Sequence, residues 1–189
     1  MGSKVSLIIG FILFCSTAVF AQLEVGASYE LRDEDPVSGF GVRVEKGFLE
    51  QLPLLRVNMR AHFSFFSDKN DISDNGINYS QNLTNYDFGV AIVTGVSVGL
   101  IEPYIGLGLG STTLDIEKSD FLNLPPGIEP PNDANESNIY FNGLIGSKVS
   151  IIPLVKPFVE YRYSNTSLSE PKVAQLTTGR IIFGVSLSF

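Results

Sequence analysis

Apolar and polar residues alternate along eight separate runs of this chain. In the last run, Gln175–Phe189, one face carries Thr177, Gly179, Ile181, Phe183, Val185, Leu187 and Phe189. The opposite face is polar or small, apart from Ile182. Alternation with a period of two predicts a β-strand that has one apolar face and one polar face.

Seven earlier runs repeat this pattern. They are Leu23–Arg32, Gly39–Phe48, Leu54–Phe66, Leu83–Val98, Pro103–Leu114, Asn138–Ser150 and Lys156–Asn165. Most of them are close to the roughly 9–11 residues that a strand needs to cross a membrane. An even number of antiparallel strands also returns both ends of the chain to the same side.

The connections between the runs alternate in character. Those after odd-numbered runs are polar and mostly long, whereas those after even-numbered runs are short. We expect the two longest, Ser67–Asn82 and Asp115–Ser137, to be loops. The first is polar, and the second contains four prolines, which exclude regular structure. This asymmetry is typical of membrane barrels with short periplasmic turns and longer outer loops.

The size of the side chains indicates which face points inward. Glycines gather on the polar face, and bulky aliphatic and aromatic residues gather on the apolar face. The interior of an eight-stranded barrel is narrow, so small and polar residues fit inside it and bulky apolar residues fit against lipid. Tyr29, Tyr86, Tyr161 and Tyr163 lie near run ends, where aromatic girdles meet the membrane surface.

The N-terminus has the features of a secretory signal peptide. Lys4 supplies the positive charge, Val5–Phe14 is a short apolar run, and Val19 and Ala21 fit the cleavage positions. We therefore expect residues 1–21 to be removed and the barrel domain to span 22–189. Cys15 is the only cysteine and would leave with the signal peptide, so we expect no disulfide.

Three segments resemble the small outer-membrane β-barrel superfamily of the OmpA/OmpX type. They are PYIGLGLG (Pro103–Gly110), PFVEYRYS (Pro157–Ser164) and GRIIFGVSLSF (Gly179–Phe189). The resemblance implies an all-β fold, an eight-stranded antiparallel up-and-down transmembrane β-barrel, in the outer membrane of a Gram-negative bacterium. It also implies contact with outer-membrane lipid and lipopolysaccharide, and with the barrel-assembly machinery during biogenesis. In that family the terminal apolar residues form part of the assembly signal, here Phe183, Leu187 and Phe189.

The polar face carries enough charge to fill a narrow interior. We expect a lumen charge network of Glu30, Arg43, Glu45, Arg56, Arg60, His62, Glu160, Arg162 and Arg180. Charges removed from water must pair to be tolerated, and Arg60 can pair with an acid such as Glu45 on the adjacent strand. Such a network either plugs the interior or forms a gated polar path for small solutes.

Two alternatives to a non-enzymatic membrane barrel stay open. His62 and Ser64 share one face and resemble the His-x-Ser pair of lipid A deacylases, which would make the protein a lipid-modifying enzyme. In that family, however, the pair sits late in the chain and faces lipid. The other alternative is a soluble periplasmic barrel that binds an apolar ligand in its interior.

Composition narrows the remaining functions. The chain has 20 acidic and 13 basic residues and a net charge of −7, which argues against a nucleic-acid partner. The segment Asp68–Gly76 is rich in oxygen ligands of the kind that bind calcium, but it lacks the spacing of an EF-hand, so we expect a solvated acidic loop there. We expect no metal and no cofactor. The leading hypothesis is a non-enzymatic outer-membrane barrel with a structural, adhesive or solute-related role; the sequence does not indicate its oligomeric state.

Overall fold

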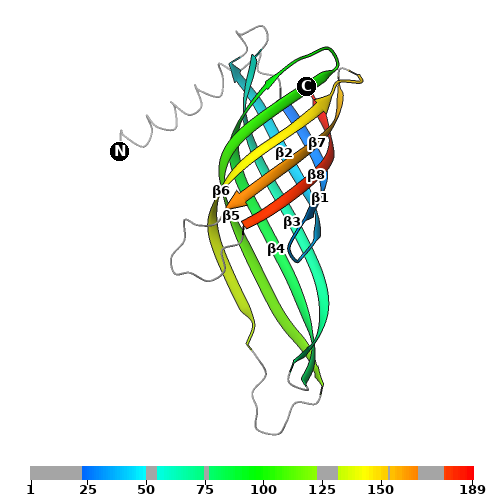
Figure 1. The fold of residues 1–189 in the computed structure, drawn as a ribbon, viewed down its shortest axis with the longest axis vertical. Coiled ribbons are helices and arrows are strands. Elements are labelled where there is room, and N and C mark those ends of the chain that lie inside the picture. Colours follow the sequence, from blue (N-terminus) through cyan, green and yellow to red (C-terminus); the bar gives the residue numbers. More distant parts are fainter. Residues whose placement is uncertain (1–22, 50–54, 75–76, 123–131, 153, 166–176) are drawn as a thin grey trace, which may run out of the picture.

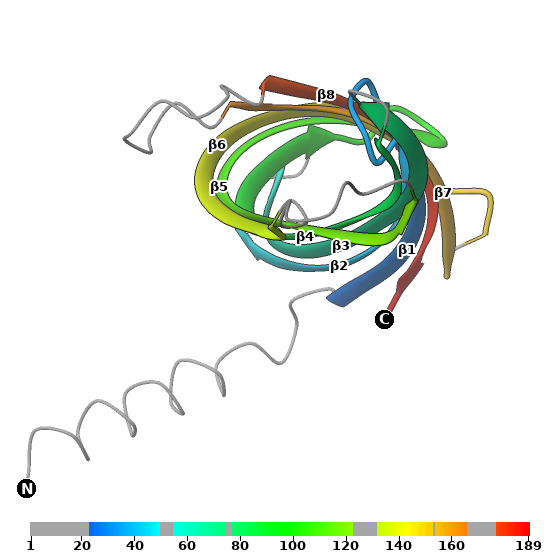
Figure 2. The same ribbon diagram turned by 90° about the horizontal axis from the view of Figure 1, so that it is seen from below.

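The computed structural model describes residues 23–49, 55–74, 77–122, 132–152, 154–165 and 177–189, which form eight antiparallel strands in one closed barrel (Figures 1 and 2). The strands are β1 (Leu23–Arg32), β2 (Ser38–Leu49), β3 (Leu55–Asp74), β4 (Ile77–Val96), β5 (Ile101–Leu122), β6 (Ala134–Val149), β7 (Val155–Asn165) and β8 (Thr177–Ser188). The fold class predicted from the sequence is confirmed. The expected signal peptide, residues 1–21, lies outside the described residues.

Each strand pairs with its neighbours in chain order, and β1 pairs with β8 to close the ring. At the closing seam Leu23 and Phe189 exchange two backbone hydrogen bonds, so both ends of the described barrel lie at the same end of it. The short connection after β4, residues 97–100, and residues 150–152 after β6 also lie there, and we call this the turn end (upper end in Figure 1). Among the described residues, no helix is long and apolar enough to span a membrane.

The polar face of every strand points into the barrel, and the apolar face points out. Arg60, Asp87 and Ser186 are fully buried, whereas Met59 and Ile92 are 59% and 57% exposed. This is the orientation predicted from the glycine distribution. It contradicts the soluble-barrel alternative, because that protein would need an apolar interior to hold an apolar ligand.

Four strands continue well beyond the predicted runs. The loops predicted over Ser67–Asn82 and Asp115–Ser137 are wrong, because β3 extends to Asp74, β4 starts at Ile77, β5 extends to Leu122 and β6 starts at Ala134. We call these additions the strand extension; it reaches away from the turn end, at the mouth end of the barrel (lower end in Figure 1). The four prolines of the second expected loop lie outside the described residues.

Backbone pairing explains this error. Polar residues occupy both faces of the extension, so the sequence shows little period-two contrast there. The ladder between β3 and β4 nevertheless runs without a break from Leu55↔Val96 to Asp74↔Ile77. Main-chain hydrogen bonds can continue a hairpin whose side chains are polar on both sides, because strand preference depends strongly on neighbouring strands.

Candidate functional site in the barrel interior

Two groups of side chains fill the interior at different heights. The turn-side cluster consists of Glu24, Arg43, Glu45, Arg60, Lys148 and Glu160. The mouth-side cluster consists of Glu30, His62, Asp87, Tyr140 and Arg180. All of these side chains are buried, and together they come from every strand except β5.

Glu45 and Glu160 organise the turn-side cluster. Glu45 lies opposite Arg60 in the β2–β3 register, and its carboxylate is 2.9 Å from Arg60 Nη2 and 2.8 Å from Lys148 Nζ. Glu160 accepts hydrogen bonds from Arg60, from Arg43 Nη1 at 3.4 Å and from Arg162 Nη2 at 2.9 Å. Each carboxylate therefore bridges cations on different strands, which ties the walls of the barrel together.

The Glu24 carboxylate and two aromatic rings complete this cluster. Glu24 Oε1 is 2.7 Å from Lys148 Nζ and 3.6 Å from Arg43 Nη2. The Arg43 guanidinium lies 3.3 Å from the centre of the Phe158 ring, and Tyr104 on β5 donates a 2.9 Å hydrogen bond to Glu160. Charged hydrogen bonds of this kind are among the stronger contacts in a low-dielectric interior.

Asp87 is the centre of the mouth-side cluster. It accepts hydrogen bonds from Arg180 Nη2 at 2.5 Å and from the Tyr140 hydroxyl at 2.6 Å. His62 Nε2 lies 3.5 Å from the same carboxylate and 3.2 Å from the Tyr140 oxygen. Glu30 lies 3.7 Å from Arg180 Nη1.

Eight of the nine residues expected in the lumen charge network lie buried in the interior: Glu30, Arg43, Glu45, Arg60, His62, Glu160, Arg162 and Arg180. Arg56 is the exception, because its side chain is 46% exposed and pairs with Glu102 at 3.2 Å. The alternation places Arg56 on the polar face, but β3 begins at Leu55, so this residue lies at the open turn end rather than inside.

Four aromatic rings are buried in the interior, those of Phe66, Tyr104, Tyr140 and Phe158, and none of them was predicted as part of the site. Aromatic residues are expected on the lipid face. Their positions in the alternation carried the signal, because each lies on the polar side of its strand. Tyr104 and Tyr140 each bind a central carboxylate, and Phe66 lies under the Arg32 guanidinium at 4.1 Å.

The residues expected in the assembly signal lie on the outside of β8 and at its end. Phe183, Leu187 and Phe189 are all exposed, and Phe189 is 68% exposed. They share the apolar outer face of the closing seam.

His62 and Ser64 do not form a nucleophile–base pair. The Ser64 hydroxyl donates a 2.9 Å hydrogen bond to Glu30, while His62 Nε2 faces Tyr140 and Asp87. A serine nucleophile needs its base within hydrogen-bond reach. Both side chains are also buried in the interior, away from a lipid substrate.

The acidic segment that we considered for calcium belongs to a strand as far as Asp74. Ser80 donates a 2.9 Å hydrogen bond to Asp71, and Lys69 lies 3.8 Å from Asp120. Within the described part of the chain, no group of three or more His, Cys, Asp or Glu side chains could hold a metal ion.

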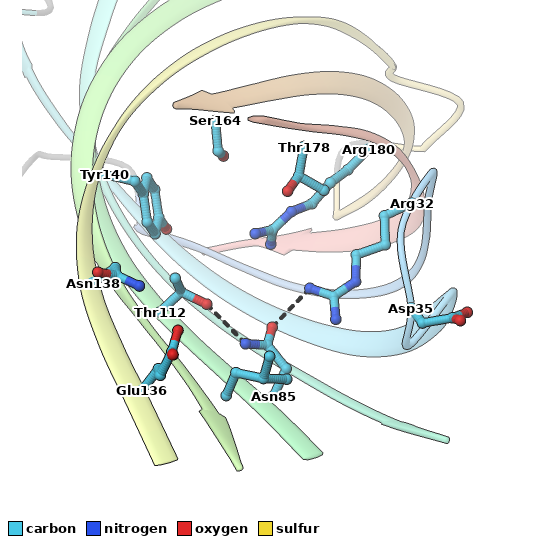
Figure 3. A pocket seen from close by; sticks show the side chains of 11 residues that line it. Arg32, Asp35, Asn85, Thr112, Glu136, Asn138, Tyr140, Ser164, Thr178 and Arg180 are labelled. Carbon is cyan, nitrogen blue, oxygen red and sulfur yellow. Dashed lines mark hydrogen bonds between the residues drawn. The ribbon is translucent and has the colours of Figure 1, made fainter. Parts of the chain in front are cut away.

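A small pocket of about 30 Å³ opens at the mouth end, directly beside the mouth-side cluster (Figure 3). Its lining consists of Arg32, Asp35, Asn85, Thr112, Leu114, Glu136, Asn138, Tyr140, Ser164, Thr178 and Arg180. Arg32 donates to Asn85 at 2.7 Å, and Asn85 donates to Thr112 at 2.8 Å, which fixes one wall. We call this the mouth pocket.

No family model matches the sequence, and no curated protein matches it. Solved structures, in contrast, share the fold at low sequence identity. Neisserial surface protein A is 17% identical with a TM-score of 0.57, and the alignment covers 89% of this chain and 97% of that chain. The N-terminal β-barrel domain of Pseudomonas aeruginosa OprF is 12% identical with a TM-score of 0.55, at 89% and 97% coverage.

A major outer membrane protein from Thermus thermophilus gives a TM-score of 0.61 at 12% identity, and the alignment covers 89% of this chain and 99% of that chain. Each of the three is aligned over nearly its whole length. This chain therefore has the fold of the small eight-stranded outer-membrane β-barrels.

Proposed function

We propose that this protein is an integral, non-enzymatic outer-membrane barrel with a closed interior, and that its strand extension is an interaction surface on the outside of the cell. The observation that carries this proposal is a sharp change in the outward side chains at the mouth end. On β3 they change from Phe65 to Ser67 and Lys69, although the strand continues to Asp74.

The apolar belt has the height of a bilayer. On β3 the outward apolar positions run from Leu55 to Phe65. Ten steps of about 3.3 Å, tilted by roughly 40°, correspond to about 25 Å, which matches the apolar band of known membrane barrels. Phe65 and Tyr86 lie at the end of the belt with their ring centres 5.4 Å apart, as in an interfacial aromatic girdle.

The interior supports a plug rather than an open pore. Glu160 alone contacts three arginines: Arg162 lies on the same strand, and the contacts with Arg43 on β2 and Arg60 on β3 cross the lumen. Eight strands enclose little more than the volume of their own side chains. A structural or adhesive role therefore fits the interior better than a solute path.

The strand extension provides a surface beyond the membrane. Asp74 lies nine residues beyond Phe65, which corresponds to roughly 30 Å along a strand. Its hydrogen-bonded hairpins give it a defined shape, and Tyr79 and Phe121 stack across it with ring centres 5.6 Å apart.

Cysteine labelling on intact cells tests the sidedness of this proposal. Cys15 is the only cysteine and lies in the expected signal peptide, so a single introduced thiol can be followed. Lys69→Cys and Asn132→Cys, in and beside the extension, should react with a membrane-impermeant maleimide. Val98→Cys, in an exposed turn at the other end, should react only after the outer membrane is opened. The reverse pattern would refute the proposed orientation.

A further inference from the structure

We propose that the mouth pocket binds an oxyanion group, such as a phosphate, through the Arg180 guanidinium and the Ser164 and Thr178 hydroxyls. The three residues lie on β7 and β8, and their side chains line the same wall of the pocket (Figure 3). This inference goes beyond the proposed function, because it assigns a ligand chemistry to one place in the barrel.

Two nitrogen atoms of the Arg180 guanidinium make no hydrogen bond among the described residues. A guanidinium carries five N–H groups in a planar fork. Nη2 is hydrogen-bonded to Asp87 and Nη1 lies 3.7 Å from Glu30, but neither Nε nor Nη1 makes a hydrogen bond among the described residues. The residue is 2% exposed. An unpartnered buried donor is costly, and a bound oxyanion would satisfy two such donors at once.

A second, independent donor lies beside it. Ser164 lines the pocket and is 3% exposed, and its hydroxyl also has no hydrogen-bond partner within the described residues. In the β7–β8 register Ser164 faces Thr178, so two hydroxyls stand side by side above Arg180. Guanidinium and hydroxyl donors that converge on one point are the usual arrangement for phosphate or carboxylate recognition.

Arg32 adds a second guanidinium group to the pocket. It lies on β1 and is the register partner of Arg180, whose own charge is paired with Asp87 and Glu30. The hydrogen bonds of Arg32 go to neutral acceptors, the Pro36 carbonyl at 2.6 Å and the Asn85 amide oxygen at 2.7 Å. Its charge is therefore available to the pocket.

Two carboxylates, those of Asp35 and Glu136, also line the pocket. In Figure 3 the Asp35 side chain points away from the space between Arg180 and Ser164, and Asp35 is exposed to solvent. Glu136 is partly exposed on the opposite wall, below Asn138. Solvent screens both charges more strongly than it screens the buried guanidinium. They confine an anion to the Arg180 side of the pocket.

The size of the pocket limits the ligand. A volume of about 30 Å³ exceeds the roughly 10–15 Å³ that one water needs, but it is far below an ordinary small-molecule cavity. It can admit one oxyanion group, either as a free ion or as the end of a larger molecule that approaches the mouth.

Calorimetric titration of the folded barrel in detergent micelles tests the proposal, with inorganic phosphate and glucose 6-phosphate as separate probes. We expect saturable binding of at least one probe. Ser164→Asp, which places a carboxylate where the anion would lie, should weaken it at least tenfold. Ser164→Ala and Thr178→Val should each weaken it several-fold. Ser188→Ala is the matched control, because this buried hydroxyl also lacks a partner among the described residues but lies at the turn end, and it should leave binding unchanged.

Binding of inorganic phosphate would identify a free ion as sufficient, and binding of the sugar phosphate alone would identify a group on a larger molecule. Gel mobility before and after boiling verifies that each variant is folded, which separates loss of the site from loss of the barrel. If Ser164→Asp does not fold, the binding measured for Ser164→Ala and Thr178→Val tests the proposal. Absence of saturable binding to a folded barrel, or equal binding by wild type and the site variants, would overturn the proposal.

Discussion

Tyr104 on β5 and Gly146 on β6 are register partners, and the phenol ring of Tyr104 lies directly over the glycine. A Cβ on Gly146 would meet the ring and its hydroxyl group. Four other interior rings have the same relationship to a glycine of a neighbouring strand: Phe66 with Gly39, His62 with Gly89, Tyr140 with Gly110, and Phe158 with Gly184. Glycines on the inner face thus make room for the rings that hold the charge clusters in place.

Gly146→Ala should therefore destabilise the barrel. The added methyl group must displace the Tyr104 ring, whose hydroxyl holds Glu160, and overpacking of this kind costs about 1–3 kcal/mol. Gly143→Ala on the same strand is the control, because the nearest atom to its Cβ is 3.8 Å away. Urea unfolding in lipid vesicles measures both, and equal stabilities would contradict the packing described here.

Arg60→Leu should be among the most damaging single changes in the interior. It leaves Glu45 and Glu160 buried with one cation fewer, and breaking a buried ion pair costs on the order of 3–5 kcal/mol. Arg56→Leu removes the same charge from the exposed turn end and should cost within about 0.5 kcal/mol. The same unfolding assay compares them, and a harmless Arg60→Leu would refute the plugged interior.

On the outer face, adding a charge should destabilise the barrel, whereas in the interior removing a charge does so. Ile92 lies between Met59 and Leu107 on the apolar belt, so Ile92→Arg would place a cation near the bilayer centre at a cost of about 2–4 kcal/mol. Ile92→Leu keeps the apolar contact with lipid and should change the free energy of unfolding very little. Tolerance of Ile92→Arg in vesicles would show that this face does not contact lipid.

Phe189→Asp should lower the yield of assembled barrel, whereas Phe189→Tyr should retain most of it. The residue shares the exposed outer face of the closing seam with Phe183 and Leu187, where the resemblance implies an assembly signal. Quantification of the protein in purified outer membranes provides the measurement. A normal yield of Phe189→Asp would exclude this residue from the signal.

The sequence predicted the strands that cross the apolar belt because burial imposes a strict contrast between successive residues. Inside the belt each residue faces either lipid or the packed interior, and the β3 run from Leu55 to Phe65 shows this alternation plainly. Beyond Phe66 most residues on both faces are polar, so alternation disappears although the strand continues to Asp74. The strand extension therefore could not be predicted from the alternation of apolar and polar residues.

The candidate site was predictable in part for the same reason. Alternation places Glu45, Arg60 and Glu160 on one face, but it cannot say which strand each side chain reaches across the lumen. The contact between Arg43 and Glu160 joins β2 to β7, and only the closed ring brings them together. The mouth pocket depends on the same closure, since its walls come from both ends of the chain.

Heat-modifiability after outer-membrane fractionation tests the central claim of a closed membrane barrel most directly. The protein should fractionate with the outer membrane, and in detergent without heating it should migrate on a gel as a compact folded species. The closed ladder from β1 to β8 leaves no free edge from which unfolding could start, so the barrel should stay folded in detergent until it is boiled. Boiling should shift all of it to the mobility of the unfolded chain. A soluble protein whose mobility is the same before and after boiling would contradict the claim.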